Sequence, residues 1–147
     1  MYYLDSLVAN SGNLLLIVIF ILLVREWFVT KNKHLVFQAV LSGSIAWIIG
    51  FLIKNFFYVP RPFILSGQTP LIPFLFDGSF PSNHAALAFG LSLPVFYKDR
   101  KIGLILFSIS VLIAFSRVIG GVHTEADILG GVTVGILSSI IVQKFRG

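Results

Sequence analysis

Long uncharged runs of apolar residues constrain the fold of this chain more than any other sequence feature. Five blocks approach the length of about 20 residues at which a helix crosses the hydrocarbon core of a bilayer. The blocks are Leu7–Val24, Leu35–Ile53, Pro81–Tyr97, Ile102–Ser116 and Ala126–Gln143. Only 12% of all residues are charged, against about 25% in an ordinary soluble domain. We therefore expect an all-α, polytopic transmembrane helical bundle with five spanning helices.

The length of 147 residues limits this bundle to a single integral membrane domain over residues 1–147. Five or six spanning helices and their connections would occupy the whole chain. The first block has no basic region before it and no small-residue cleavage site after it, so we expect a retained helix rather than a signal peptide. The absence of cysteine excludes disulfides, thiolate metal sites and a cysteine nucleophile.

Residues 55–80 interrupt the helical pattern between the second and third blocks. The interruption comes from Pro60, Pro62, Pro70, Pro73, Gly67 and Gly78. Because proline removes a helical hydrogen bond, we expect these prolines to break any helix here. The stretch Ile64–Phe76 is too short and too rich in proline to span, so we expect it to lie at the interface or to dip back, covered by other helices.

Basic residues divide unevenly between the two sides that five helices would create. Eight of the eleven fall on the side that holds the C-terminus: Arg25, Lys31, Lys33, Lys98, Arg100, Lys101, Lys144 and Arg146. Lys and Arg are retained on the cytoplasmic side, so we expect the N-terminus outside and the C-terminus in the cytoplasm of a plasma or inner membrane. The net charge of +5 thus reflects orientation in a membrane rather than affinity for nucleic acid.

The three remaining basic residues are expected at the outer ends of the helices, together with two of the three histidines. The full set is Lys54, Arg61, Ser82, Asn83, His84, Arg117, His123 and Asp127. Three cations offer charge-assisted hydrogen bonds to a tetrahedral phosphate. Pro81 favours a helix start, where free N–H groups and the Ser82 hydroxyl would form an anion site. The set therefore favours capture and cleavage of a phosphate ester.

The two histidines supply the chemistry of such a cleavage. His123 and Asp127 are four residues apart, so we expect them on one helical face, with the carboxylate fixing one ring nitrogen. The other nitrogen is then free to attack phosphorus, and His84 can protonate the departing oxygen. Because the cations stabilise the developing charge, we expect no metal ion and no cofactor.

Each of these residues also has a structural interpretation. Lys54 and Arg117 could be basic anchors at helix ends, Ser82 could be a helix cap, and the histidines could link helices. The two cations lie on the side where the charge rule disfavours them, which favours the functional interpretation. Glu125 lies beside the set and is expected to be a solvated residue at its rim.

Three motifs carry these residues, and their order and spacing resemble the signatures of the type 2 phosphatidic acid phosphatase family. Residues 54–62 fit Lys-x6-Arg-Pro, residues 81–84 resemble Pro-Ser-Gly-His, and residues 116–127 fit Ser-Arg-x5-His-x3-Asp. Asn83 departs from the pattern by standing in place of glycine; asparagine tolerates positive φ better than most residues. Many family members have six spanning helices, where we expect five.

The resemblance implies a metal-independent membrane lipid phosphatase that works through a phosphohistidine. It implies His123 as nucleophile, Asp127 as its orienting partner and His84 as general acid. The implied phosphate ligands are Lys54, Arg61, Ser82, Asn83 through its backbone, and Arg117.

Residues 79–85 look most like the bacterial undecaprenyl-diphosphate phosphatase branch, in which Ser-Phe-Pro-Ser-Asp-His-Ala is common, and Asp77 suits that pattern. We therefore expect conversion of undecaprenyl diphosphate to undecaprenyl phosphate at the extracytoplasmic face. A phospholipid substrate (phosphatidylglycerol phosphate or phosphatidate) and lipid A are alternatives. Two other functions stay open, namely a non-catalytic protein that binds phosphorylated lipids and a vanadate-dependent halide oxidase. The sequence fixes neither the lipid nor the oligomeric state.

Overall fold

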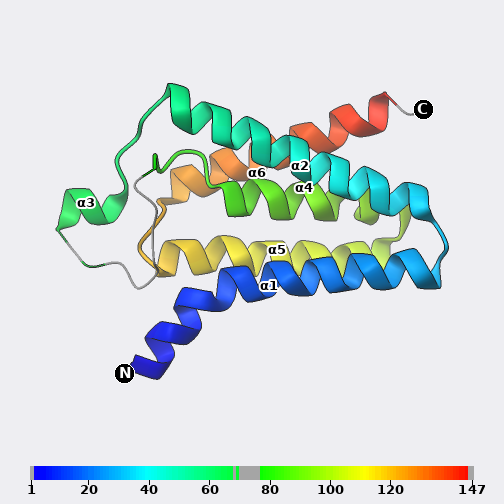
Figure 1. Cartoon of the computed structure of the whole chain (residues 1–147), viewed down its shortest axis with the longest axis horizontal. Helices are drawn as coiled ribbons and strands as arrows, with labels where there is room; N and C mark the ends of the chain where they lie inside the picture. The colour runs from blue at the N-terminus through cyan, green and yellow to red at the C-terminus, as the bar shows by residue number, and fades with distance from the viewer. Residues whose placement is uncertain (1, 68, 70–76, 146–147) are drawn as a thin grey trace.

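The computed structural model describes residues 2–67, 69 and 77–145, with side chains from residue 10 onward, and this part of the chain is all-helical. Its helices, in chain order, are α1 (Tyr2–Val29), α2 (Lys33–Phe56), α3 (Pro62–Ser66), α4 (Asn83–Lys98), α5 (Arg100–Ile119) and α6 (Glu125–Lys144). Figure 1 shows the long helices packed side by side and α3 standing apart at one end. Arg146 lies outside the described residues.

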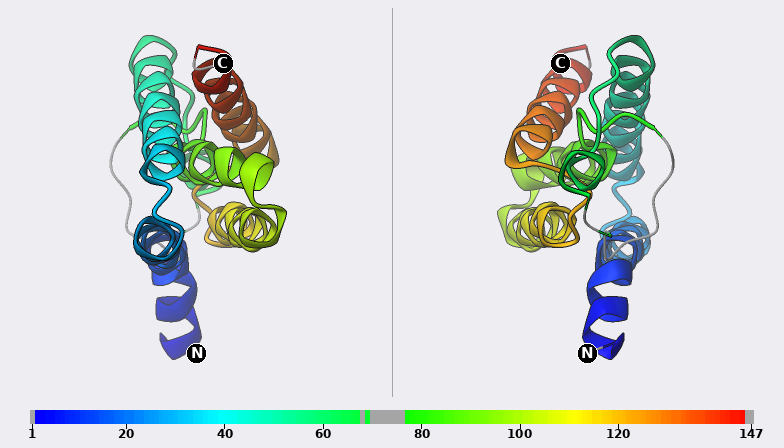
Figure 2. Two further views of the ribbon diagram at one scale, coloured as in Figure 1. Left: turned by 90° about the vertical axis from the view of Figure 1, so that its right-hand side faces the viewer. Right: turned by 90° about the vertical axis from the view of Figure 1, so that its left-hand side faces the viewer.

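Helix α4 is the centre of the bundle. It packs against α2, α5 and α6, while α1 lies along α5 and its first turns project away from the bundle (Figures 1 and 2). A buried cluster that includes Ile19, Ala39 and Leu91 joins α1, α2 and α4. Glycine lets the helices approach closely, because a Cβ atom at Gly135 of α6 would come within 2.7 Å of the Ala86 carbonyl oxygen of α4.

The chain reverses so that one end of the bundle collects all the predicted site residues. Helices α2 and α5 finish at the end where α3 lies, and α4 and α6 begin there (Figure 1). The α1–α2 and α4–α5 connections lie at the opposite end, near the C-terminus of α6.

Four helical segments in the described residues are long and apolar enough to cross a membrane, namely Asn10–Val29, α2, α5 and α6. Their outer faces carry large exposed apolar side chains such as Ile21, Phe51 and Leu112, as a lipid environment requires. These segments correspond to four of the five predicted blocks and support a multi-pass membrane protein.

The predicted third block, Pro81–Tyr97, forms α4, and five spanning helices are not confirmed. Helix α4 has 16 residues, and most of its side chains from Ala85 to Val95 are buried inside the protein. An apolar sequence indicates that a helix is shielded from water, but it does not distinguish a helix that faces lipid from one enclosed by other helices. The structure therefore supports four spans, and the fifth stays a prediction.

The prediction that proline prevents any helix between residues 55 and 80 is wrong for one short segment. Pro62 occupies the first position of α3, where a missing N–H removes no helical hydrogen bond, and Gly67 ends the helix with a φ of 66°. Residues 70–76 lie outside the described residues, so the interfacial placement of Ile64–Phe76 stays a prediction.

Candidate active site

The structure brings the predicted cations and histidines together where α2 and α5 end and α4 and α6 begin. His84, in the first turn of α4, interacts electrostatically with His123 and with all three cations: Lys54, Arg61 and Arg117. The three cations are each 6% exposed, although they lie at helix ends or in loops. Buried charges require partners, so the contacts of each cation define the site.

Lys54, in the last turn of α2, is held by backbone carbonyl groups. Its Nζ donates to the Gly78 oxygen at 2.6 Å and to the Ser79 oxygen at 3.3 Å. These bonds tie the end of α2 to the segment that leads into α4.

Arg61, the residue just before α3, is held in a similar way. Its Nη1 donates to the Val122 oxygen at 3.1 Å, and its Nε donates to the Asp77 backbone oxygen at 3.4 Å. One guanidinium therefore joins three segments that are far apart in the sequence, and its orientation is fixed by carbonyl groups.

The Asp77 side chain bridges these two cations. Its Oδ1 accepts a hydrogen bond from Arg61 Nη2 at 2.5 Å, and its Oδ2 lies 3.6 Å from Lys54 Nζ. Partial burial raises the pKa of Asp77, but the hydrogen bond from Arg61 and the charge of Lys54 outweigh that effect and hold it below its usual value. The carboxylate is therefore charged at neutral pH.

Several buried polar atoms at this end have no hydrogen-bond partner within the described residues. They include the Ser82 hydroxyl and both Nε and Nη1 of Arg117. Ser82 occupies the N-cap position of α4, but its side chain makes no capping hydrogen bond, so the interpretation as a hydroxyl cap is wrong. Its backbone N–H instead donates to the Asp127 carbonyl at 2.9 Å. Buried donors of this kind are available to an anionic ligand.

Asn83, which stands where the resemblance places glycine, is the first residue of α4. Lys31 is the one non-glycine residue with positive φ in the described part of the chain, so position 83 does not require the left-handed conformation. The Asn83 side chain packs against Gly50 of α2, where a Cβ atom would collide with its Oδ1. A glycine on the neighbouring helix thus makes room for the larger residue.

Helix α1 contributes to the site in a way that the sequence did not predict. Asn13 Oδ1 lies 2.9 Å from His84 Nε2, and a Cβ atom at Gly12 would come within 3.3 Å of Arg117 Nη1. The only sequence signal was the polar interruption of an otherwise apolar block near these residues. The amide oxygen can only accept, so this contact favours a proton on Nε2.

Asp127 is the most highly connected carboxylate of the site. Its Oδ2 accepts hydrogen bonds from Ser79 Oγ at 2.5 Å and from the Thr124 N–H at 2.7 Å, and lies 3.5 Å from His123 Nδ1. Ser79 Oγ is also 3.5 Å from the same imidazole nitrogen. Ser79 is 1% exposed, and no role for it was predicted, although it begins the segment 79–85 noted above.

The prediction that His123 and Asp127 share one helical face is wrong. Thr124 caps α6 and Glu125 is its first residue, so His123 lies in the preceding loop. The Thr124 hydroxyl accepts from the Asp127 N–H at 3.2 Å while the Asp127 carboxylate accepts from the Thr124 N–H, which forms a capping box. This box, rather than helical periodicity, brings the carboxylate to the imidazole.

The environment of His123 keeps its ring neutral. Burial lowers the pKa of His123 to about 4, and the charges of Lys54 and Arg61 act in the same direction against the opposing effect of Asp127. A neutral imidazole has a lone pair on one nitrogen, which a nucleophile needs. No group of three or more His, Cys, Asp or Glu side chains is arranged to hold a metal ion in the part of the chain that the structure describes.

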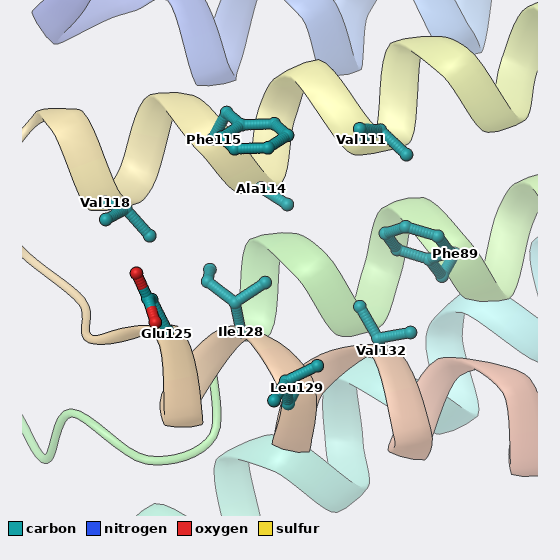
Figure 3. Close-up of a pocket in the computed structure, with 9 residues that line it drawn as sticks. All are labelled: Phe89, Val111, Ala114, Phe115, Val118, Glu125, Ile128, Leu129 and Val132. Atoms are coloured by element: carbon teal, nitrogen blue, oxygen red, sulfur yellow. The ribbon is translucent and has the colours of Figure 1, made fainter.

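Two cavities lie at or near this end of the bundle. One, of about 550 Å³, reaches Asp127 and is lined also by Val59, Pro60, Pro62, Leu65, Ser66 and Thr124. The other, of about 370 Å³, is an apolar groove between α5 and α6 whose floor is Phe89 of α4 (Figure 3). Glu125 and Val118 lie at one end of that groove, where the Glu125 carboxylate is its one charged group.

Comparison with known proteins relates this geometry to one family. The family model described as the PAP2 superfamily matches residues 14–147. The chain is 31% identical over 144 residues to undecaprenyl-diphosphatase BcrC of Bacillus subtilis, covering 97% of this chain and 75% of that protein.

Two crystal structures are similar over nearly the whole chain. LpxE of Aquifex aeolicus superposes with a TM-score of 0.81 at 31% identity, covering 97% of this chain and 86% of that one. A PAP2-type phosphatidylglycerolphosphate phosphatase of Bacillus subtilis superposes with a TM-score of 0.71 at 26% identity, covering 98% and 77%.

Proposed function

This chain is a lipid phosphatase of the PAP2 superfamily, and from that premise we propose that it hydrolyses undecaprenyl diphosphate to undecaprenyl phosphate at the extracytoplasmic face. One observation carries the proposal: three buried cations and two histidines converge at one end of the bundle. The choice of lipid is supported by the similarity to BcrC of Bacillus subtilis. The similarity to a phosphatidylglycerolphosphate phosphatase makes phosphatidylglycerol phosphate the second candidate.

In the proposed reaction, His123 attacks the terminal phosphorus atom. Its Nδ1 faces Asp127 and Ser79, which leaves Nε2 to form the new N–P bond. The bond between phosphorus and the bridging oxygen breaks, and that oxygen takes a proton from the protonated form of His84. The three cations around His84 disfavour this form, and the negative charge of the incoming phosphate offsets them. Water then cleaves the phosphohistidine and releases inorganic phosphate. Asp127 stabilises the positive charge that the His123 ring gains during the transfer.

The phosphate oxygens would be bound by Lys54, Arg61 and Arg117. The guanidinium Nε and Nη1 of Arg117 and the hydroxyl of Ser82 are buried donors without partners in the described residues, so they can bind an anion without first losing another bond. The N–H groups at the start of α4, including that of Asn83, add the positive end of a helix. These contacts strengthen as charge builds up on the oxygens during transfer.

We propose that the lipid approaches through the cavity of about 550 Å³, because this cavity reaches Asp127 and is lined by the apolar side chains of Val59 and Leu65. The groove between α5 and α6 is a poorer route, since the Glu125 carboxylate at one of its ends would repel a phosphate. The hydrocarbon chain would stay in the bilayer while the phosphate reaches the cations.

The proposed orientation follows from the position of the remaining basic residues. The α1–α2 connection carries Lys31, and the α4–α5 connection is flanked by Lys98 and Arg100, all at the end opposite the site (Figure 1). Basic residues stay on the cytoplasmic side, so the site would face the exterior or periplasm.

Phosphate release by the purified protein in detergent with EDTA tests the proposal. Undecaprenyl diphosphate, phosphatidylglycerol phosphate and phosphatidate are compared side by side, and the first should be turned over fastest. His123→Ala should abolish turnover, while His34→Ala, a histidine-to-alanine change at the start of α2, serves as the matched control. Near-normal activity of His123→Ala would refute the nucleophile, and loss of activity in EDTA would refute metal independence. Phosphate binding without turnover of any lipid would instead favour a non-catalytic protein.

A further inference from the structure

A carboxylate of the protein is already paired with two of the three cations that we propose as phosphate ligands. Asp77 contacts Arg61 Nη2 at 2.5 Å through Oδ1 and lies 3.6 Å from Lys54 Nζ through Oδ2. Two oxygens of one anion thus reach two cations, which is also how two oxygens of a phosphate group would bind them. An anionic substrate and the Asp77 side chain therefore compete for the same donors.

The two cations do not depend on Asp77 for their positions. Lys54 Nζ donates to the backbone oxygens of Gly78 and Ser79, and Arg61 Nη1 donates to that of Val122. The Nε of Arg61 bonds the backbone oxygen of Asp77 rather than its side chain. If the carboxylate swung away, the ammonium and guanidinium groups would keep these carbonyl partners, and Arg61 Nη2 would become available.

Asp77 also differs from the other carboxylate of the site in its freedom to leave. The Asp77 side chain is 40% exposed, whereas those of Lys54 and Arg61 are 4% and 8% exposed. The Asp127 side chain is 3% exposed and is held by hydrogen bonds from Ser79 and Thr124. Of these two carboxylates, Asp77 is the one that can exchange its protein contacts for water at moderate cost.

We propose that Asp77 is an exchangeable counter-ion of the phosphate site. It neutralises Lys54 and Arg61 when no substrate is bound, gives way to the phosphate group, and returns to help expel inorganic phosphate after hydrolysis. The proposal rests on the assignment of these two cations as phosphate ligands. The pKa of Asp77 lies below its usual value, so the carboxylate stays charged when the pH falls within the neutral range. Displacing it from the two cations therefore requires an incoming anion.

This role has a definite sign, because a competitor weakens the binding of the ligand it competes with. Asp77→Asn keeps the shape of the side chain but removes its charge, and it should tighten the binding of inorganic phosphate about tenfold, the order expected for one charge-assisted hydrogen bond. Product inhibition by inorganic phosphate should strengthen by a similar factor. A residue that merely holds the cations in place would show the opposite sign, with weaker phosphate binding.

The experiment measures inorganic phosphate binding to the purified full chain by isothermal titration calorimetry, which requires no turnover. Glu125→Gln removes a carboxylate from the same end of the molecule and controls for the general field, while Asp99→Asn makes the same chemical change at the opposite end. Both controls should leave phosphate affinity within about twofold of the unmodified protein. Asp77→Ala, which lacks any acceptor on its side chain, provides a second variant and should change affinity in the same direction as Asp77→Asn.

The outcomes separate this inference from the proposed function. Unchanged or weaker phosphate binding by both Asp77 variants overturns the counter-ion role, whether or not the enzyme turns over lipid phosphates. An equal gain in Glu125→Gln also overturns it, because the effect would then be a general change of charge. Tighter binding confined to the Asp77 variants supports it, even if no lipid tested proves to be a substrate.

Discussion

Replacing Ser79 by alanine tests whether the hydroxyl of this residue positions His123 and Asp127, the proposed nucleophile and its partner. Ser79 Oγ donates to Asp127 Oδ2 at 2.5 Å and lies 3.5 Å from His123 Nδ1. Both oxygens are buried, since Ser79 is 1% and Asp127 2% exposed. The substitution leaves the Asp127 carboxylate with the Thr124 N–H at 2.7 Å and the longer contact to His123 Nδ1 at 3.5 Å, and it lets the carboxylate and the imidazole shift relative to each other.

The expected size of the effect follows from the nature of the lost bond. A hydrogen bond to a charged group contributes about 1.5–3 kcal/mol, and each 1.36 kcal/mol of lost transition-state stabilisation slows a reaction about tenfold. We therefore expect kcat to fall by about 10- to 100-fold in Ser79→Ala. KM should change by less than about twofold, because Ser79 contacts none of the three cations through its side chain.

Initial rates of phosphate release, measured over a range of substrate concentrations, give the two constants separately. Ser110→Ala is the matched control, because Ser110 is also fully buried but donates to the Ala88 and Leu106 carbonyls at 3.0 and 2.9 Å, away from the site. A Ser79→Ala protein with kcat within about twofold of the unmodified enzyme, or an equal loss in Ser110→Ala, would refute the positioning role.

Two further predictions concern protonation and orientation. In NMR spectra of histidine-labelled protein, the His123 ring should titrate near pH 4, because burial and nearby cations disfavour its protonated form. The ring should therefore stay neutral as the pH falls through 6.5. A titration midpoint at or above pH 6 would contradict this environment. The chain has no cysteine, so a single introduced cysteine can report the orientation. A membrane-impermeant maleimide applied to intact cells should label a Thr69→Cys variant and spare a Lys101→Cys variant. The reverse pattern would overturn the proposed orientation.

The sequence predicted which side chains meet because three motifs carry the cations, the histidines and Asp127 at characteristic spacings. It did not predict how they are held together. The Asp127 carboxylate bonds Ser79, and His84 contacts Asn13; these pairs are 48 and 71 residues apart and arise only when helices pack. No local pattern encodes such contacts, although residues 79–85 and the polar start of the first block marked the segments involved.

Local interpretation failed where two physical causes give the same pattern. A four-residue spacing predicted that His123 and Asp127 share a helical face. However, a threonine at 124 with an aspartate three residues later is also the pattern of a capping box, and this box starts the helix after His123. For α4 the pattern does not decide: apolar composition predicted that it spans the membrane, but enclosure by neighbouring helices demands the same composition, so this span stays a prediction.

Charge balance explains why a site for a phosphate dianion would contain a carboxylate that can leave. Lys54, Arg61 and Arg117 are buried, and Asp127 alone would leave them with an excess of two positive charges. Uncompensated charge is costly in a buried site, so a second carboxylate, Asp77, stabilises the empty state by reducing that excess to one. A dianion that displaces Asp77 into water meets an excess of two and neutralises it. The same arithmetic disfavours a monoanion, which would displace Asp77 without improving the balance, so the site selects ligands by charge before any contact with the lipid chain is made.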